Sequence, residues 1–285
     1  MSSNYLIVGC GDIGRRVASL YEFNTIHGIV RSQESKILNE KLNIDTFLID
    51  LDDSSQTLPQ LRYTNIFYFT PPPSEGTSDP RLQNFLNNIC NTTKRIVLIS
   101  TTGVYGNSHG KWIDETTPTN PRTDRAHRRL SAEQLLISWA KLNNTEFIIL
   151  RVPGIYAKDR LPLSRIKKRL AVVRTNEAGW TNRIHADDLA SACKAAMESE
   201  ISNQIINITD GNPSSMTDYF NHVADYAGLE RPPHISMKEA ERTLSDGMVS
   251  YLKESRRIKN DKMLNILNIT LQYPTLSKGL NKKAR

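Results

Sequence analysis

The residues of this chain best suited to chemistry begin with a glycine-rich segment near the N-terminus, 9–14, which reads Gly-Cys-Gly-Asp-Ile-Gly. Its spacing, G-x-G-x-x-G, is a weak signal alone. Here it directly follows an apolar run, Tyr5–Val8, and opens a stretch with helical character, Ile13–Tyr21. A strand before the glycines and a helix after them is the context in which this spacing binds a dinucleotide. The alternative is a glycine-rich turn that holds no ligand.

Each glycine of the segment has a distinct expected role. Gly9 would permit the tight turn, Gly11 would let the backbone approach a pyrophosphate, and Gly14 would let the helix pack closely on the sheet. The pyrophosphate is then expected against the backbone N–H groups of Gly11, Asp12 and Ile13.

The end of the second apolar run selects among dinucleotides. An acidic residue there, about 20 residues past the glycines, binds the ribose hydroxyls of NAD, whereas an arginine accommodates the 2′-phosphate of NADP. Arg31 and Ser32 occupy this place, and Arg15 offers a second cation. The sequence therefore favours NADP, with NAD less favoured; the alternative for Arg31 is a solvated side chain at a strand end. Asp50 follows the third run, where its carboxylate could bind the adenine amino group or simply cap a following helix.

Short apolar runs alternating with helical stretches must position these residues. The runs lack polar alternation, which is typical of strands covered on both faces and hence of a parallel sheet. Repeated strand–helix units of this kind predict an α/β doubly wound (Rossmann) fold. The expected strands are 5–8, 25–30, 45–49, 65–69, 95–99, 146–150 and 204–207, and the expected helices are 13–21, 82–90 and 124–142.

The pattern weakens after Arg151. We expect a dinucleotide-binding domain over 1–153, to which 183–209 returns, and a smaller C-terminal substrate lobe made of 154–182 and 210–285.

Motifs along nearly the whole chain resemble those of the extended short-chain dehydrogenases/reductases, which include nucleotide-sugar epimerases and dehydratases. The Ser100–Gly106 segment is similar to the family's S-S-x-x-V-Y-G. Further resemblances, in order, are Ile113–Glu115 with Pro118, Leu150–Tyr156, Arg183–Ala190, and Tyr273–Pro274 with Gly279–Leu280. The last of these, with the three prolines 71–73, resembles the atypical YeeZ-like (NAD-dependent epimerase/dehydratase-like) branch.

The resemblance also implies where catalytic residues belong. The family uses a tyrosine as general acid/base and a lysine spaced Y-x-x-x-K on one helix, with a Ser or Thr hydroxyl that orients the substrate. Aligned on Glu133, this chain has Arg125 at the tyrosine position and Arg129 at the lysine position, and Thr101 supplies the hydroxyl. Arg129 can still donate hydrogen bonds to a ribose. Arg125 offers electrostatic stabilisation only, because a guanidinium stays protonated. His127 has a suitable pKa range for an acid/base, but two residues past Arg125 it faces another side of the helix, and the alternative is a surface or packing role.

Two functions follow from the resemblance. The first is an NADP(H)-dependent oxidoreductase or epimerase of atypical mechanism that transfers a hydride on a hydroxyl or carbonyl of a sugar-like or nucleotide-sugar substrate. The second is a non-catalytic NADPH-binding regulatory or interaction protein, which the replaced tyrosine and lysine favour.

Composition excludes several other classes. A 285-residue chain that is 38% hydrophobic buries a substantial core, and no apolar run is long enough to span a membrane. No secretory signal is visible, so we expect a cytoplasmic protein. Three scattered cysteines predict neither a disulfide framework nor a metal site. The net charge of +7 suits an anionic small molecule; no aromatic-interleaved basic motif indicates nucleic acid, and a homodimer is compatible with the sequence.

Overall fold

A seven-stranded parallel sheet forms the centre of the computed structural model, which describes residues 5–21, 26–59, 63–89 and 92–281. Its strand order is β12-β7-β5-β4-β1-β2-β3, the doubly wound arrangement expected from the sequence. All six strand pairs are parallel. The strands are β1 (Tyr5–Val8), β2 (Ile26–Val30), β3 (Asp45–Leu48), β4 (Asn65–Tyr68), β5 (Arg95–Thr101), β7 (Glu146–Val152) and β12 (Gln204–Asn207).

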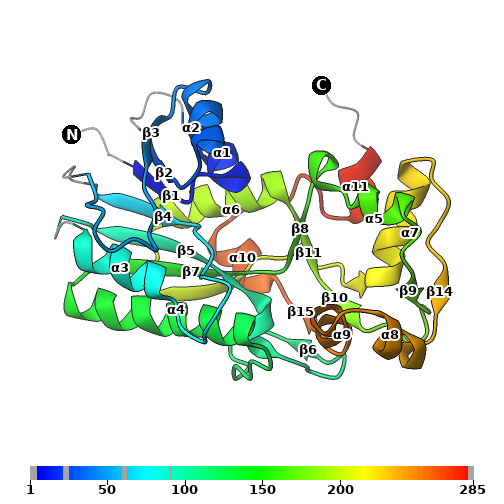
Figure 1. Ribbon diagram of the computed structural model, residues 1–285. Helices are drawn as coiled ribbons and strands as arrows, with labels where there is room; N and C mark the ends of the chain where they lie inside the picture. Colours follow the sequence, from blue (N-terminus) through cyan, green and yellow to red (C-terminus); the bar gives the residue numbers. More distant parts are fainter. Residues whose placement is uncertain (1–4, 22–25, 60–62, 90–91, 282–285) are drawn as a thin grey trace.

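Helices cover both faces of this sheet (Figure 1). One face carries α1 (Asp12–Ala18), α6 (Ala186–Glu198) and α10 (Asp261–Ile266), and the other carries α3 (Pro80–Asn88) and α4 (Asp124–Leu142). The helix α2 (Gln33–Glu40), which the sequence did not predict, packs against β2 and β3. The expected first residue of the second strand, Thr25, and the expected last residue of the 82–90 helix, Cys90, lie outside the described residues.

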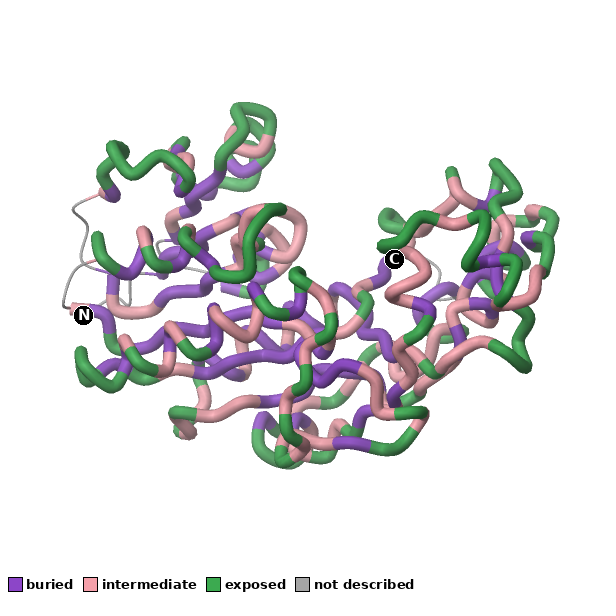
Figure 2. Tube along the Cα trace, turned by 60° about the horizontal axis from the view of Figure 1, so that its bottom comes forward, coloured by how far each residue is buried: buried purple, intermediate pink, exposed green. Residues whose placement is uncertain are grey.

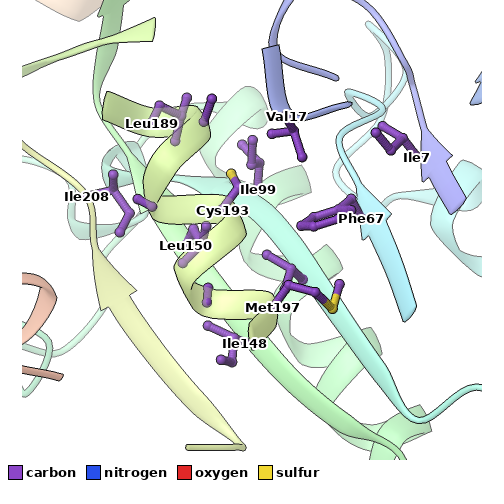
Figure 3. Close-up of a cluster of buried hydrophobic side chains, with 14 of the residues drawn as sticks. Ile7, Val17, Phe67, Ile99, Ile148, Leu150, Leu189, Cys193, Met197 and Ile208 are labelled. Carbon is purple, nitrogen blue, oxygen red and sulfur yellow. The ribbon is translucent and has the colours of Figure 1, made fainter. Parts of the chain in front are cut away.

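Alternate residues of each strand enter opposite halves of the core, because successive side chains point to opposite faces. Ile7 and Phe67 join the cluster under α1 and α6, whereas Leu6 and Tyr68 join the cluster under α3 and α4. Figure 3 shows the first cluster, with Cys193 of α6 among the strand residues. Buried positions consequently run along the strands (Figure 2), which explains their unbroken apolar runs.

A smaller lobe lies beside the carboxyl ends of the strands (Figure 1), which matches the predicted fold class. Its own core is built around Phe220 and Val223 of α7. From this end of the chain, α10 returns to the sheet, where Met263 joins the core under α6. The remaining elements are η1 (Thr102–Tyr105), β6 (Trp112–Ile113), β8 (Gly154–Tyr156), η2 (Lys158–Arg160), α5 (Leu163–Lys167), β9 (Val172–Val173), β10 (Trp180–Thr181), β11 (Arg183–His185), β13 (Ser214–Ser215), α7 (Met216–Tyr226), β14 (His234–Ile235), α8 (Met237–Thr243), α9 (Asp246–Leu252), β15 (Arg257–Ile258) and α11 (Leu276–Asn281).

None of the helices in the described ranges is long and apolar enough to cross a membrane.

Candidate functional site

The glycine turn has the geometry that a dinucleotide cradle requires. Gly9 has φ +80°, and a Cβ there would lie 2.6 Å from the backbone nitrogen of Thr70. At Gly14 a Cβ would lie 3.0 Å from Cγ2 of Ile7, which is tighter than most Cβ contacts, so the glycine lets the helix pack closely on the sheet. A Cβ on Gly11, by contrast, would meet no other residue's atom nearer than 4.0 Å. The space in front of Gly11 is therefore open to a ligand.

The side chain of Asp12 points to the smaller lobe. Its carboxylate accepts from Arg16 at 3.1 Å and from Arg160 at 2.5 Å. Burial alone would raise the pKa of Asp12, but these two guanidinium groups outweigh burial and lower it. Arg16 also bonds Asp159 of η2 and Asp187 of α6, each at 2.6 Å. The carboxylate thus ties α1 to the lobe, and only the backbone of Asp12 is available to a pyrophosphate.

A cavity of about 200 Å³ adjoins the turn where β1, β2, β3 and β4 end. Gly9, Arg31 and Asp50 line it. Ser32 does not line it but caps α2 by accepting from the Ser35 backbone at 3.2 Å. Asp50 accepts from the Asp52 backbone at 3.0 Å. The alternative of a helix cap at Asp50 is wrong, because residues 51–59 contain turns but no helix.

An arginine that sequence reasoning missed, Arg81, also lines this cavity. It holds both oxygens of Asp52, at 2.6 and 2.5 Å, and Arg31 approaches the same carboxylate at 3.6 Å. The Arg31 side chain is 65% exposed. Two guanidinium groups thus share the Asp52 carboxylate, and Arg31 is the more exposed of the two.

A larger cavity of about 690 Å³ lies between the carboxyl ends of β5 and β7, the first turns of α4 and the smaller lobe. The structure brings all three predicted catalytic positions, Thr101, Arg125 and Arg129, onto its wall. Thr101 ends β5, and its Oγ1 accepts from the backbone of Gly103 at 3.2 Å. His127, the alternative acid/base, is exposed and does not line the cavity among the described residues.

The arginines of α4 differ in their surroundings. Arg125 is exposed, Arg128 is buried and donates to the Gly76 carbonyl at 2.7 Å, and Arg129 donates to the Ile99 carbonyl at 3.1 Å. Burial lowers the pKa of Arg129, while the charge of Asp79 acts in the opposite direction. In the part of the chain that the structure describes, none of the three has an ion-pair partner within 4.0 Å.

A buried polar network holds the end of β5 next to Thr101, through the neighbouring residue Ser100. Glu133, 1% exposed, accepts from Ser100 Oγ at 2.5 Å and pairs with Arg151, 4% exposed, at 2.7 and 3.1 Å. The Arg151 guanidinium lies 4.8 Å from the ring centre of Tyr105, whose hydroxyl donates to Asn207 at 2.9 Å. This network joins β5, α4, β7 and β12, and its member Ser100 lines the cavity.

The smaller lobe supplies the opposite wall, which sequence reasoning missed. Trp180 of β10 and Tyr251 of α9 line the cavity together with Glu254 and Arg256. Arg256 donates to Glu254 and to the Gly106 carbonyl, both at 2.6 Å. Tyr156, a residue of the resembling motifs, is instead buried against Gly279, where a Cβ would lie 2.5 Å from its hydroxyl.

The described residues contain no group of three His, Cys, Asp or Glu side chains placed to hold a metal ion.

Comparisons with known proteins agree with this geometry. Residues 82–209 match the model of the NAD dependent epimerase/dehydratase family. Over 132 residues the chain is 28% identical to a Streptomyces protein described as a 3-diazoavenalumate denitrifying reductase. That match spans 46% of this chain and 43% of the reductase, less than half of either protein.

Similar solved structures extend over the whole chain. A functionally unknown conserved protein from Silicibacter pomeroyi is 26% identical with a TM-score of 0.86, covering 98% of this chain and 97% of that one. UDP-glucuronic acid 4-epimerase from Bacillus cereus, in complex with NAD, is 18% identical with a TM-score of 0.77. UDP-glucose 4-epimerase from Thermotoga maritima, with UDP-glucose, is 17% identical with a TM-score of 0.78. Each epimerase match covers 97% of this chain and 96% of the other, and shows a shared fold.

Proposed function

We propose that this chain, which belongs to the NAD-dependent epimerase/dehydratase family, binds NADP(H) and transfers a hydride on a hydroxyl or carbonyl of a sugar-like substrate. The observation that carries the proposal is the meeting of two cavities at the carboxyl edge of the sheet. The cavity bordered by Gly9 and the one bordered by Thr101 share Arg31, Pro71 and Arg81. An adenosine at one end and a nicotinamide with substrate at the other would follow this edge.

The residues present fit NADP. Open space in front of Gly11 admits a pyrophosphate, and the end of β2 carries Arg31 in place of a carboxylate. Arg81 holds both oxygens of Asp52, so the 65% exposed Arg31 side chain keeps N–H donors for a 2′-phosphate. When bound, the nicotinamide would supply or accept the hydride.

The chain's own residues would orient the substrate and stabilise charge. Thr101 would hydrogen-bond the reacting oxygen, and Arg125 would stabilise negative charge that develops there. Arg129 would hold the nicotinamide ribose. Since neither guanidinium can move a proton, we assign that role to Tyr251, the tyrosine that lines the cavity among the described residues.

A non-catalytic NADPH-binding regulatory or interaction protein is the second candidate. It is favoured by the replacement of the family's tyrosine and lysine by Arg125 and Arg129. The description of the Streptomyces relative as a reductase favours the first candidate.

NADPH oxidation with a panel of carbonyl substrates separates the two. The first predicts turnover that Thr101→Ala and Tyr251→Phe each lower at least about tenfold, the loss of one positioned catalytic group. Arg122→Ala, a matched change on an exposed arginine outside the cavity lining, should leave turnover unchanged. Thermal stabilisation by NADPH with no turnover across the panel would contradict the first and support the second.

A further inference from the structure

We propose that the substrate of this cleft is an acidic sugar-like molecule whose carboxylate or phosphate is bound by Arg125 and Arg128 and whose ring packs on Trp180. The inference rests on the proposed function and names the substrate class of the same site.

The lining of the larger cavity carries an excess of positive charge. Six arginines but one carboxylate, Glu254, line the 690 Å³ cavity in the described chain. That carboxylate is already bonded to Arg256, and the arginines at the adenosine end share Asp52. The positive charges without an ion-pair partner within the described ranges are therefore the three from α4. An oxyanion entering the cavity would meet these guanidinium groups with no competing carboxylate.

Those three arginines differ in their hydrogen-bond partners and exposure. Arg125 and Arg128 stand at i and i+3, neighbouring positions on a helix surface. One nitrogen of Arg128 holds the Gly76 carbonyl, which fixes the side chain and leaves further N–H donors of its guanidinium. Arg129, at i+4 from Arg125, is intermediate in exposure and donates to the Ile99 carbonyl of β5. Because Arg129 is assigned to the nicotinamide ribose, Arg125 and Arg128 remain to bind the two oxygens of a carboxylate or phosphate.

Trp180 stands on the wall of the cavity that the smaller lobe supplies. Trp180 is 43% exposed although its backbone is fixed: its nitrogen donates to Ser255 Oγ at 3.0 Å, and its carbonyl accepts from Arg256 at 3.1 Å. The guanidinium of Arg257 lies 5.4 Å from its ring centre. An exposed tryptophan with a fixed backbone on a cavity wall offers a surface for the flat face of a ring. Trp112 lies 5.3 Å from the same guanidinium and is 46% exposed, but does not line the cavity.

The test is a calorimetric titration of the full chain, with and without saturating NADP⁺, against glucose 6-phosphate, glucuronate and glucose. Both acidic sugars should bind about 10- to 100-fold more tightly than glucose, the range for a hydrogen bond to a charged group. Arg125→Ala should remove most of this preference, and Arg122→Ala should retain it. Because Arg125 is exposed, its loss leaves the fold intact. A higher affinity for glucose 6-phosphate than for glucuronate indicates a phosphate site, and the reverse order indicates a carboxylate site.

The tryptophans give a second, independent arm. Trp180→Ala should lower the affinity for each of the three sugars by about tenfold, and Trp112→Ala should leave these affinities unchanged. Glucose binding as tightly as the acidic sugars, or equal losses in Arg125→Ala and Arg122→Ala, would overturn the inference. NADP⁺ binding is measured in the same samples. Acid-selective binding without NADP⁺ binding would contradict the proposed function alone, and NADP⁺ binding without acid selectivity would contradict this inference alone.

Discussion

Replacing Glu133 by glutamine should destabilise this protein far more than its small change of shape suggests. Glutamine keeps an acceptor for Ser100, but it removes the charge opposite Arg151. The Arg151 guanidinium is 4% exposed and held beside the Tyr105 ring, so it cannot turn to solvent. Breaking one side of such a buried pair costs about 3–5 kcal/mol. That is a large part of the roughly 5–15 kcal/mol by which a typical protein is stable.

Urea denaturation at pH 7 measures the effect as a change in midpoint at constant m-value. Glu40→Gln is the matched control: its partner Lys36 is at i−4 on α2, 3.3 Å away, and the pair is partly exposed. This change should cost at most about 0.5 kcal/mol. A double variant, Glu133→Leu with Arg151→Met, removes both charges and should recover much of the lost stability. A loss below about 1 kcal/mol for Glu133→Gln would refute the reasoning. It would mean that the buried Arg151 guanidinium can lose its charged partner with little loss of stability.

Three further expectations follow from single positions. Gly11→Ala should leave the melting temperature nearly unchanged but weaken NADPH binding at least about tenfold, since its Cβ would enter open ligand space. Gly14→Ala should instead lower stability by about 1–3 kcal/mol, because its Cβ would press on Ile7; equal stability of the two variants would contradict the assigned roles. Burial raises the pKa of Asp210 from 3.8 to about 7, so the folded state keeps a proton that the unfolded state releases. Stability should therefore fall as pH rises from about 4 to 7 and then level off. The free energy of unfolding of Asp210→Asn, relative to that of wild type, should therefore rise by about 2–3 kcal/mol between pH 5 and pH 8. Denaturation at each pH measures this difference, and a difference that does not change with pH would count against the prediction.

Much of the fold could be predicted because its strands are buried on both faces. The 124–142 helix and the 204–207 strand have the bounds expected from the sequence. The first helix is shorter than expected and ends at Ala18. The helix α2 could not be predicted, because it has no apolar stripe. Its one buried residue is Asn39, which donates to the Cys10 carbonyl at 3.1 Å.

The site was predictable only where a motif or a strand end fixes it. Gly11, Arg31 and Thr101 follow strands directly, and the carboxyl ends of parallel strands meet at one edge. Arg128 carried a usable signal, its helical spacing from Arg125, which places both on one face. Trp180 gave no such signal, because it reaches the cavity through a distant lobe of short elements without periodicity.

The central claim, an NADP(H) site along the carboxyl edge of the sheet, is tested most directly by the dissociation constants of NADPH and NADH. They are measured by nicotinamide fluorescence for wild type and Arg31→Ala at one ionic strength. Wild type should bind NADPH at least about tenfold more tightly than NADH, since a charge-assisted hydrogen bond contributes about 1.5–3 kcal/mol. Arg31→Ala should remove that difference and leave NADH affinity unchanged. Equal affinities in wild type, or a preference for NADPH that survives the substitution, would contradict it.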